Sequence, residues 1–220
     1  MLRVEFHCHT IYSKDCLVRV ENLIETCMRK GIDRIVITDH NTTAGAFEAQ
    51  KIDPQRIIVG EEIKTQKGEL LAAFMQEEIP AGLPALETIA CLREQGAFIS
   101  VSHPFDQLRS GHWQVDDLIE ITPLVDAIEI FNARCMSPDF NRQAAEFARE
   151  NQLAGTVGSD AHTAFEIGRA AMLLPDFHDV KSFKEALPKA QFETQLSSPL
   201  VHFTSRYAVW YKQIFNLQVP

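Results

Sequence analysis

Residues 2–15 read L-R-V-E-F-H-C-H-T-I-Y-S-K-D, and this opening decides how the rest of the chain is interpreted. A short strand-like run leads directly into His7 and His9, and Asp15 follows. Side chains two positions apart in a strand point the same way, so both imidazoles can reach one metal ion. Cys8 points to the other face and is expected in the core. Imidazole with carboxylate favours a divalent metal such as zinc, manganese or iron.

Four later segments repeat this arrangement of a short apolar run with imidazole or carboxylate side chains at or near its end. They are R-I-V-I-T-D-H with His40, I-I-V-G-E-E-I-K-T with Glu62, I-S-V-S-H-P-F with His103, and T-V-G-S-D-A-H-T with Asp160 and His162. A carboxylate on a strand that lines a core is costly unless it is paired or binds metal, so Glu62 is predicted to bridge metals. The sequence therefore predicts a cluster of ligands from several strands.

Local sequence adds expectations for three of these segments. Asp39 either orients a neighbouring imidazole or caps the helix expected from Thr43. Pro104 is expected to hold His103 in an extended conformation. Gly158 is expected to permit an unusual turn before Asp160.

Short β-rich runs alternate with amphipathic stretches along the chain, which predicts an α/β fold with a largely parallel sheet. Strands are predicted at 2–6, 34–38, 57–63, 70–75, 97–102, 127–131, 155–157 and 170–174. Helices are predicted at 20–30, 43–50, 85–95, 115–120, 140–151 and 180–187. Ligands from this many strands favour a closed or nearly closed barrel, with the metal site at the C-terminal ends of the strands. A doubly wound sheet would gather its site from fewer strands.

The organisation of the chain predicts one domain over residues 1–220. Residues from about 198 to 220 are rich in aromatic side chains, and they are predicted to pack on the barrel as a C-terminal helix or arm. No repeat, linker or membrane-spanning apolar run interrupts the chain.

Composition limits the functional classes. The protein has 220 residues, 45% of them hydrophobic and 23% charged, which is ordinary for a globular protein. Five scattered cysteines without a C-x-x-C pair predict reduced thiols and a cytoplasmic location. The net charge of -9 disfavours binding to duplex nucleic acid, but it permits a small anionic substrate held by bound cations.

Taken together, H-C-H-T-I-Y-S-K-D, T-D-H, G-E-E-I, S-H-P and G-S-D-A-H resemble the PHP family of polymerase and histidinol phosphatase domains. The resemblance implies a distorted (β/α)7 barrel that holds two to three divalent metals (Zn, Mn or Fe). It implies that His7, His9, Glu62 and Asp160 hold the first metal, that Asp15, His40 and His162 hold another, and that Glu62 and His103 share a third. One departure is Leu71, which stands about where many members have a further histidine. Glu69 is nearby, but the sequence alone does not assign it that role.

The expected activity is that of a metal-dependent phosphoesterase. Several cations around one cavity favour attack of metal-bound hydroxide on a small phosphate mono- or diester, and Asp160 is the candidate proton acceptor. Arg134, Arg109, Asn132 and Lys64 are candidate substrate-binding residues, because cationic and polar groups recognise phosphate oxygens. The alternatives are a 3'–5' exonuclease or nucleotide phosphatase, an amidohydrolase-type hydrolase, and a non-catalytic metal-stabilised interaction module.

Overall fold

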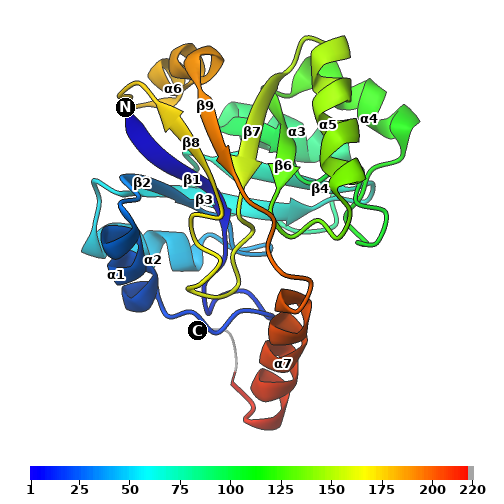
Figure 1. Ribbon diagram of the computed structural model, residues 1–220. Helices are drawn as coiled ribbons and strands as arrows, with labels where there is room; N and C mark the ends of the chain where they lie inside the picture. The colour runs from blue at the N-terminus through cyan, green and yellow to red at the C-terminus, as the bar shows by residue number, and fades with distance from the viewer. Residues whose placement is uncertain (218–220) are drawn as a thin grey trace.

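A nine-stranded sheet forms the centre of the computed structural model, which describes residues 1–217 (Figure 1). The strands are β1 Leu2–Cys8, β2 Arg34–Ile37, β3 Ile57–Lys64, β4 Glu69–Ala73, β5 Phe98–Val101, β6 Ala127–Asn132, β7 Ala154–Gly158, β8 Ala170–Leu174 and β9 Gln191–Thr194. They are ordered β7-β6-β5-β4-β3-β2-β1-β8-β9.

The sheet curls until β7, at one end of the sheet, lies beside β1 next to the predicted ligands. The backbone amide of His9 donates to the carbonyl of Ala161 at 2.9 Å, and the amide of Asp160 donates to the carbonyl of His7 at 2.7 Å. These bonds join β1 to the segment that follows β7, so β1 to β7 form a nearly closed barrel. The predicted α/β barrel is therefore confirmed.

The prediction of a largely parallel sheet was wrong. Within the described residues four strand pairings are parallel and four are antiparallel. The short β3–β4 connection explains part of this difference, because a few residues can join antiparallel neighbours but cannot make a parallel crossover. As a result β4 is antiparallel to β3 and β5. Its first residue, Glu69, therefore lies beside the last residues of β3 and β5, at the end of the barrel that carries the site.

Helices cover the outside of the sheet, as Figure 1 shows. They are α1 Val20–Lys30, α2 Ala44–Ile52, α3 Ala85–Glu94, α4 Val115–Ile121, α5 Pro138–Glu150, α6 Val180–Ala186 and α7 Val201–Ile214, with short 3-10 turns at Thr122–Leu124 and Leu187–Lys189. Every predicted helix exists, with ends shifted by a few residues. Gly31 and Gly96 adopt the left-handed conformation expected after helices, with φ of 66° and 71°.

Two apolar layers hold the barrel in place. One layer joins the outer face of the sheet to the helices and includes Leu23, Ile35 and Ile99. The other fills the barrel, where Phe6 packs against Phe98 and Phe183 with ring centroids 5.6 and 5.7 Å apart. The packed interior leaves the ends of the strands as the place where polar side chains gather.

The C-terminal segment forms α7, which projects beyond the sheet at the end opposite α6 (Figure 1). This agrees with the expected C-terminal helix, although residues 218–220 of the predicted segment lie outside the described residues. Among residues 1–217, no helix combines the length and the apolar character needed to cross a bilayer.

Candidate metal centre

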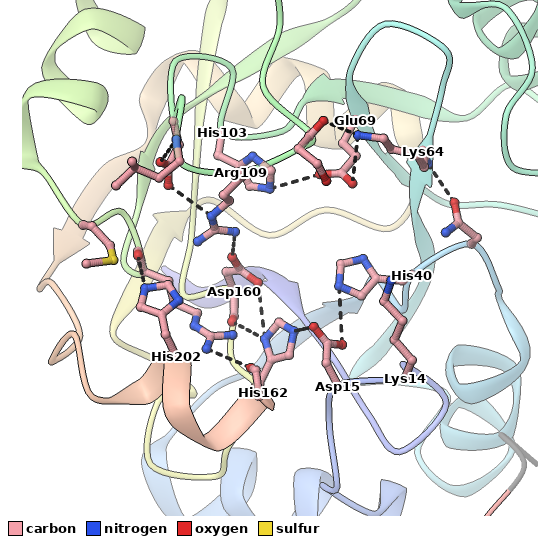
Figure 2. Close-up of a pocket in the computed structure, with 18 of the residues that line it drawn as sticks. Lys14, Asp15, His40, Lys64, Glu69, His103, Arg109, Asp160, His162 and His202 are labelled. Atoms are coloured by element: carbon pink, nitrogen blue, oxygen red, sulfur yellow. Dashed lines mark hydrogen bonds and ion pairs between the residues drawn. The ribbon is translucent and has the colours of Figure 1, made fainter. Parts of the chain in front are cut away.

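The side chains predicted as metal ligands converge at one end of the barrel. His7, His9, Glu62, His103, Asp160 and His162 are buried, whereas Asp15 and His40 are partly exposed toward a pocket. Figure 2 shows Asp15, His40, His103, Asp160 and His162 grouped around that pocket. Three overlapping groups have ligand atoms that all lie within 4.8 Å of one another: His9, His40 and His162; His7, His9 and Glu62; and Glu62, Glu69 and His103.

Glu62 lies at the centre of the cluster. Its Oε2 is 2.9 Å from His40 Nδ1, 3.4 Å from His7 Nε2 and 3.5 Å from His9 Nε2. Its Oε1 is 3.0 Å from His103 Nε2. The two oxygens therefore face different imidazoles, as a carboxylate that bridges two cations must do.

Protein groups fix the orientation of His7. Its Nδ1 lies 2.9 Å from Glu129 Oε1, so this nitrogen carries the proton and donates. Its Nε2 therefore faces the centre, 3.2 Å from His9 Nε2. A hydrogen bond of this kind is typical of imidazoles that bind metal.

Asp39 orients His9 through a serine. Ser13 donates its hydroxyl hydrogen to Asp39 Oδ1 at 2.6 Å, and its Oγ lies 3.1 Å from His9 Nδ1. Asp39 also accepts from the backbone amide of Thr10 at 2.7 Å. Of the two roles considered for Asp39, the contacts support orientation of the imidazole, because Asp39 accepts from Thr10 and Ser13, whereas the amide of Ala44 at the start of α2 donates to Thr42 Oγ1.

A second carboxylate, Asp15, bridges two imidazoles on the open side of the cluster. Its Oδ2 is 3.2 Å from His162 Nε2, and its Oδ1 is 3.5 Å from His40 Nε2. His162 donates from Nδ1 to the carbonyl of Asp160 at 2.8 Å, which leaves Nε2 free to face Asp15. This half of the cluster borders the pocket.

Glu69 occupies the place near His103 that the sequence analysis left open. Its Oε2 is 3.6 Å from His103 Nε2, whereas Leu71 is fully buried inside the barrel. Leu71 pairs with Glu62 across the β3–β4 ladder, and Glu69 pairs with Lys64. Because β4 is antiparallel to β3, the N-terminal end of β4 lies nearest the site. Glu69, at that end, is therefore closer to the cluster than Leu71, which is two residues further along the strand.

Asp160 is held from two sides. Its Oδ1 is 3.1 Å from His9 Nε2, while its Oδ2 accepts from Asn132 Nδ2 at 3.2 Å and forms an ion pair with Arg109. Arg109 is itself held by Asp106 at 3.1 Å. Asn132 is buried, and both its Oδ1 and its Nδ2 bond protein groups, which differs from the substrate contact predicted for it.

Arg134 lines the pocket but is not a free guanidinium. It is 4% exposed, and its Nε is 3.1 Å from Glu166 Oε1. Its Nη2 donates to Val201 O and to Ser205 Oγ, both at 2.9 Å. These contacts give Arg134 a scaffold role, and its predicted substrate contact stays a prediction.

The pocket has a volume of about 800 Å³ and lies over the exposed side of the cluster. Its cationic rim includes Lys14, Lys64 and Arg109, and its far wall carries His202 and Ser205 of α7. Lys64 lies 3.7 Å from Glu69 Oε1 and also donates to the carbonyl of Ser110. A small polar molecule fits this volume.

Burial and neighbouring charges set the protonation of the central groups. Burial lowers the pKa of His9 well below its usual value, and the nearby His162 and His40 lower it further, which favours a neutral imidazole. Burial alone would raise the pKa of Glu62, but His7 and His40 outweigh it and hold that pKa well below its usual range. Burial would also lower the pKa of His7 and of His40, but nearby carboxylates, Glu62 foremost, outweigh it and raise both values well above the usual one, so these two imidazoles carry the positive charge when no cation is bound. Metal ions bind neutral imidazole and ionised carboxylate, so they would replace those protons.

The backbone conformations at His103 and Gly158 differ from those that the sequence predicted. His103 has a φ of 20° and is not extended as Pro104 suggested, because its amide donates to Glu129 Oε2 at 2.9 Å and its carbonyl accepts from Asp106. The unusual turn belongs to Asp160, whose φ is 52°. Gly158 serves a close approach instead, since a Cβ there would lie 2.3 Å from His7 Cβ. Strained backbone of this kind concentrates at functional sites.

The donor set fits divalent cations. Glu62 Oε2 and Asp15 Oδ1 are buried oxygens that receive no hydrogen bond among the described residues. Buried ionised oxygens of this kind are costly unless a cation satisfies them. Mixed nitrogen and oxygen donors suit divalent metals, and the choice of zinc, manganese or iron stays a prediction.

Comparison with known proteins identifies the family. The PHP domain family matches residues 5–152, and the PHP-associated family matches residues 138–192. The chain belongs to the PHP family. The uncharacterized protein MJ0417 of Methanocaldococcus jannaschii is 38% identical to this PHP chain over 173 residues, which are 77% of this chain and 69% of that protein.

Solved structures share the PHP fold. A two-domain protein containing a predicted PHP-like metal-dependent phosphoesterase, from Bacteroides vulgatus, aligns with a TM-score of 0.71 and 18% identity over 88% of this chain and 65% of its own. An amidohydrolase from Chromobacterium violaceum with bound sulfate aligns with a TM-score of 0.61 and 13% identity over 86% of this chain and 97% of its own. At such identities the likeness shows the fold alone.

Two acidic residues of the PHP chain were not singled out from the sequence. Glu129 orients His7, and Glu166 accepts from the amide of His162 at 3.2 Å while it pairs with Arg134. A signal existed for Glu129, because it alternates with apolar residues in A-I-E-I-F, where a buried carboxylate needs partners. No comparable signal marked Glu166.

Proposed function

We propose that this PHP chain is a metal-dependent phosphoesterase that hydrolyses a small phosphate mono- or diester. The observation that carries the proposal is the set of three ligand groups, joined in turn through His9 and Glu62, beneath a pocket with a cationic rim. Clustered cations are suited to phosphoryl chemistry because they neutralise several oxygens at once.

The contacts support the ligand assignment that the family resemblance implied. His7, His9, Glu62 and Asp160 would hold one cation, and Asp15, His40 and His162 would hold a second. Glu62, Glu69 and His103 offer a third set. When bound, divalent cations supply Lewis acidity that lowers the pKa of water and stabilises charge on phosphate oxygens.

Asp160 suits cation binding better than proton transfer. Burial raises the pKa of its carboxyl, but Arg109 and His7 outweigh burial and hold it well below its usual range. A carboxylate with so low a pKa is a weak proton acceptor near neutral pH. We therefore assign Asp160 to the metal and leave the proton acceptor unassigned.

Cationic side chains at the pocket provide the phosphate anchors in this proposal. Arg109 keeps its Nη1 on Asp160, while Lys14 and Lys64 lie at the pocket wall. Lysine binds phosphate as a point charge and arginine binds it through paired donors. A small phosphorylated substrate, a nucleotide included, fits the volume, and five free thiols favour a cytoplasmic setting.

A matched substrate panel tests the proposal. Metal-free protein is loaded with Mn²⁺ or Zn²⁺ and assayed on 4-nitrophenyl phosphate, bis(4-nitrophenyl) phosphate, and an amide and a lactone that carry the same chromophore. We expect turnover of a phosphate ester that chelation abolishes, and loss of most of that turnover in Glu62→Gln. Turnover of the amide or lactone alone would favour the amidohydrolase alternative, which the likeness to the Chromobacterium protein also raises.

A further inference from the structure

We propose that α7 positions the metal centre from outside the barrel, and that Lys212 is the positioning residue. In this proposal Lys212 fixes the loop that carries Ser13 and Asp15, so that Ser13 contacts His9 and the backbone amide of His40, and Asp15 faces His40 and His162. The inference rests on the proposed metal-dependent function. It adds a contribution that comes from neither family match, since those matches end at residue 192 and α7 begins at Val201.

The burial pattern of α7 is the reverse of the pattern in an ordinary surface helix, which exposes its lysines and buries its large apolar side chains. Lys212 is 7% exposed, while Phe203, Tyr207 and Trp210 are each more than half exposed. Burying an ammonium group costs free energy unless strong partners compensate, and leaving aromatic rings in water forgoes apolar burial. A helix that buries its lysine instead of its aromatic side chains therefore has a specific use for that lysine.

Two backbone carbonyls receive the ammonium group. Lys212 Nζ donates to Ile11 O at 2.5 Å and to Ser13 O at 2.6 Å. No carboxylate of the described chain lies within ion-pair distance of this nitrogen. The cation therefore binds the loop backbone itself, and it fixes the path of the chain between His9 and Asp15.

That loop contributes to both halves of the cluster. Ser13 Oγ contacts His9 Nδ1 and accepts from the backbone amide of His40 at 3.0 Å. Asp15, two residues later, contacts both His40 and His162. His9 has further support from the barrel, because its amide bonds Ala161, whereas Asp15 Oδ1 receives no hydrogen bond among residues 1–217. Loss of the loop position should therefore weaken the Asp15 group most.

The other end of α7 is tied to the opposite side of the same group. Arg134 Nη2 donates to Val201 O and Ser205 Oγ, and His202 lies 3.1 Å from the carbonyl of Arg134. Arg134 pairs with Glu166, which accepts from the amide of His162. Helix α7 thus spans from the loop after β1 to the loops after β6 and β7, with the Asp15–His40–His162 group between its two attachments.

Titration of metal-free protein with Mn²⁺ tests the role of Lys212. In Lys212→Met we expect one class of site to lose affinity by about tenfold or more, a size typical of groups that orient ligands. The remaining class should keep its affinity. Arg206→Met, which removes an exposed cation from the same helix, is the matched control and should change neither class.

A second variant and a second readout separate positioning from general stability. Lys212→Gln is shorter and uncharged but remains a donor, and it should show the same selective loss if Lys212→Met does not fold. The thermal midpoint measured in chelator should fall more for Lys212→Met than for Arg206→Met, because two backbone carbonyls lose a charged donor. The gain in midpoint on adding Mn²⁺ should shrink only for Lys212→Met, and this second difference reports positioning.

Two results would overturn the inference while leaving the proposed function intact. One is unchanged affinity at every site in both Lys212 variants. The other is equal weakening of all sites together with a lower thermal midpoint in chelator, because a purely structural lysine behaves in that way. Failure of the unsubstituted protein to bind any divalent ion would refute the proposed function itself.

Discussion

At the scale of the residue, the site depends on which ring nitrogen of each histidine bonds the protein and which faces the centre of the cluster. His7, His9 and His162 each use Nδ1 on a protein group and turn Nε2 toward the centre. This common arrangement comes from three different partners, namely Glu129, Ser13 and a backbone carbonyl. Sequence spacing alone identified the imidazoles as ligands but could not show the partners, because those come from distant segments of the chain.

Glu69 provides a residue-scale test of the third ligand group. Glu69→Gln replaces a carboxylate oxygen near His103 with an amide, so the group formed with Glu62 should lose affinity for a cation. We expect the metal content to fall by about one ion per chain or less, with the other ions retained. Elemental analysis measures this, with exposed Glu77→Gln as the control. Unchanged metal content would exclude Glu69 as a ligand.

Arg134 provides a test of scaffold against substrate contact. Arg134→Met leaves the buried Glu166 carboxylate without its cationic partner. Breaking one partner of a buried ion pair costs about 3–5 kcal/mol, so the free energy of unfolding should fall by about that amount. Urea denaturation measures it, and Arg142→Met, which alters an exposed pair, is the control. A stable variant with a raised KM would instead make Arg134 a substrate anchor.

At the scale of the element, strand direction decided what the sequence could predict. Strands and helices were found from the sequence, because apolar runs and caps such as Gly31 and Gly96 are local signals. The direction of β4 was missed, since it depends on the pairing of whole strands. For that reason the sequence could name Glu69 near Leu71 but could not assign it to the site. Strand β9 was also missed, because all four of its residues are exposed and carry no apolar pattern.

The two faces of β3 give an element-scale prediction about pH. Glu62 faces the site, whereas Glu61 faces outward under the segment that carries Ile79. Burial raises the pKa of Glu61 from 4.5 to about 8, although the Ile79 amide opposes this shift. The folded state therefore keeps a proton that the unfolded state releases, and stability falls as the pH rises from about 4.5 to about 8.

Glu61→Gln should remove that pH dependence. The difference in unfolding free energy between Glu61→Gln and the unsubstituted protein should grow in favour of the variant by on the order of a few kcal/mol between pH 5 and pH 8. Both proteins are measured in chelator, so that metal binding does not contribute. A constant difference over this range would show that the folded-state pKa of Glu61 is not raised.

At the scale of the whole molecule, the fold brings many negative charges to one place. Asp15, Glu62, Glu69, Glu129 and Asp160 all contact the cluster, and Arg109 is the guanidinium that pairs with it. Such a group is stabilised by cations that bind the folded chain and not the unfolded chain. We therefore expect divalent ions to stabilise the folded barrel, with α7 positioning part of their binding site.

The metal content of the protein tests this account most directly. Protein purified without chelator is analysed for divalent ions and protein concentration together. The three overlapping ligand groups predict about two to three ions per chain, mostly zinc, manganese or iron. Fewer than about one tightly held ion per chain would contradict the account, because clustered phosphoesterase sites require several ions.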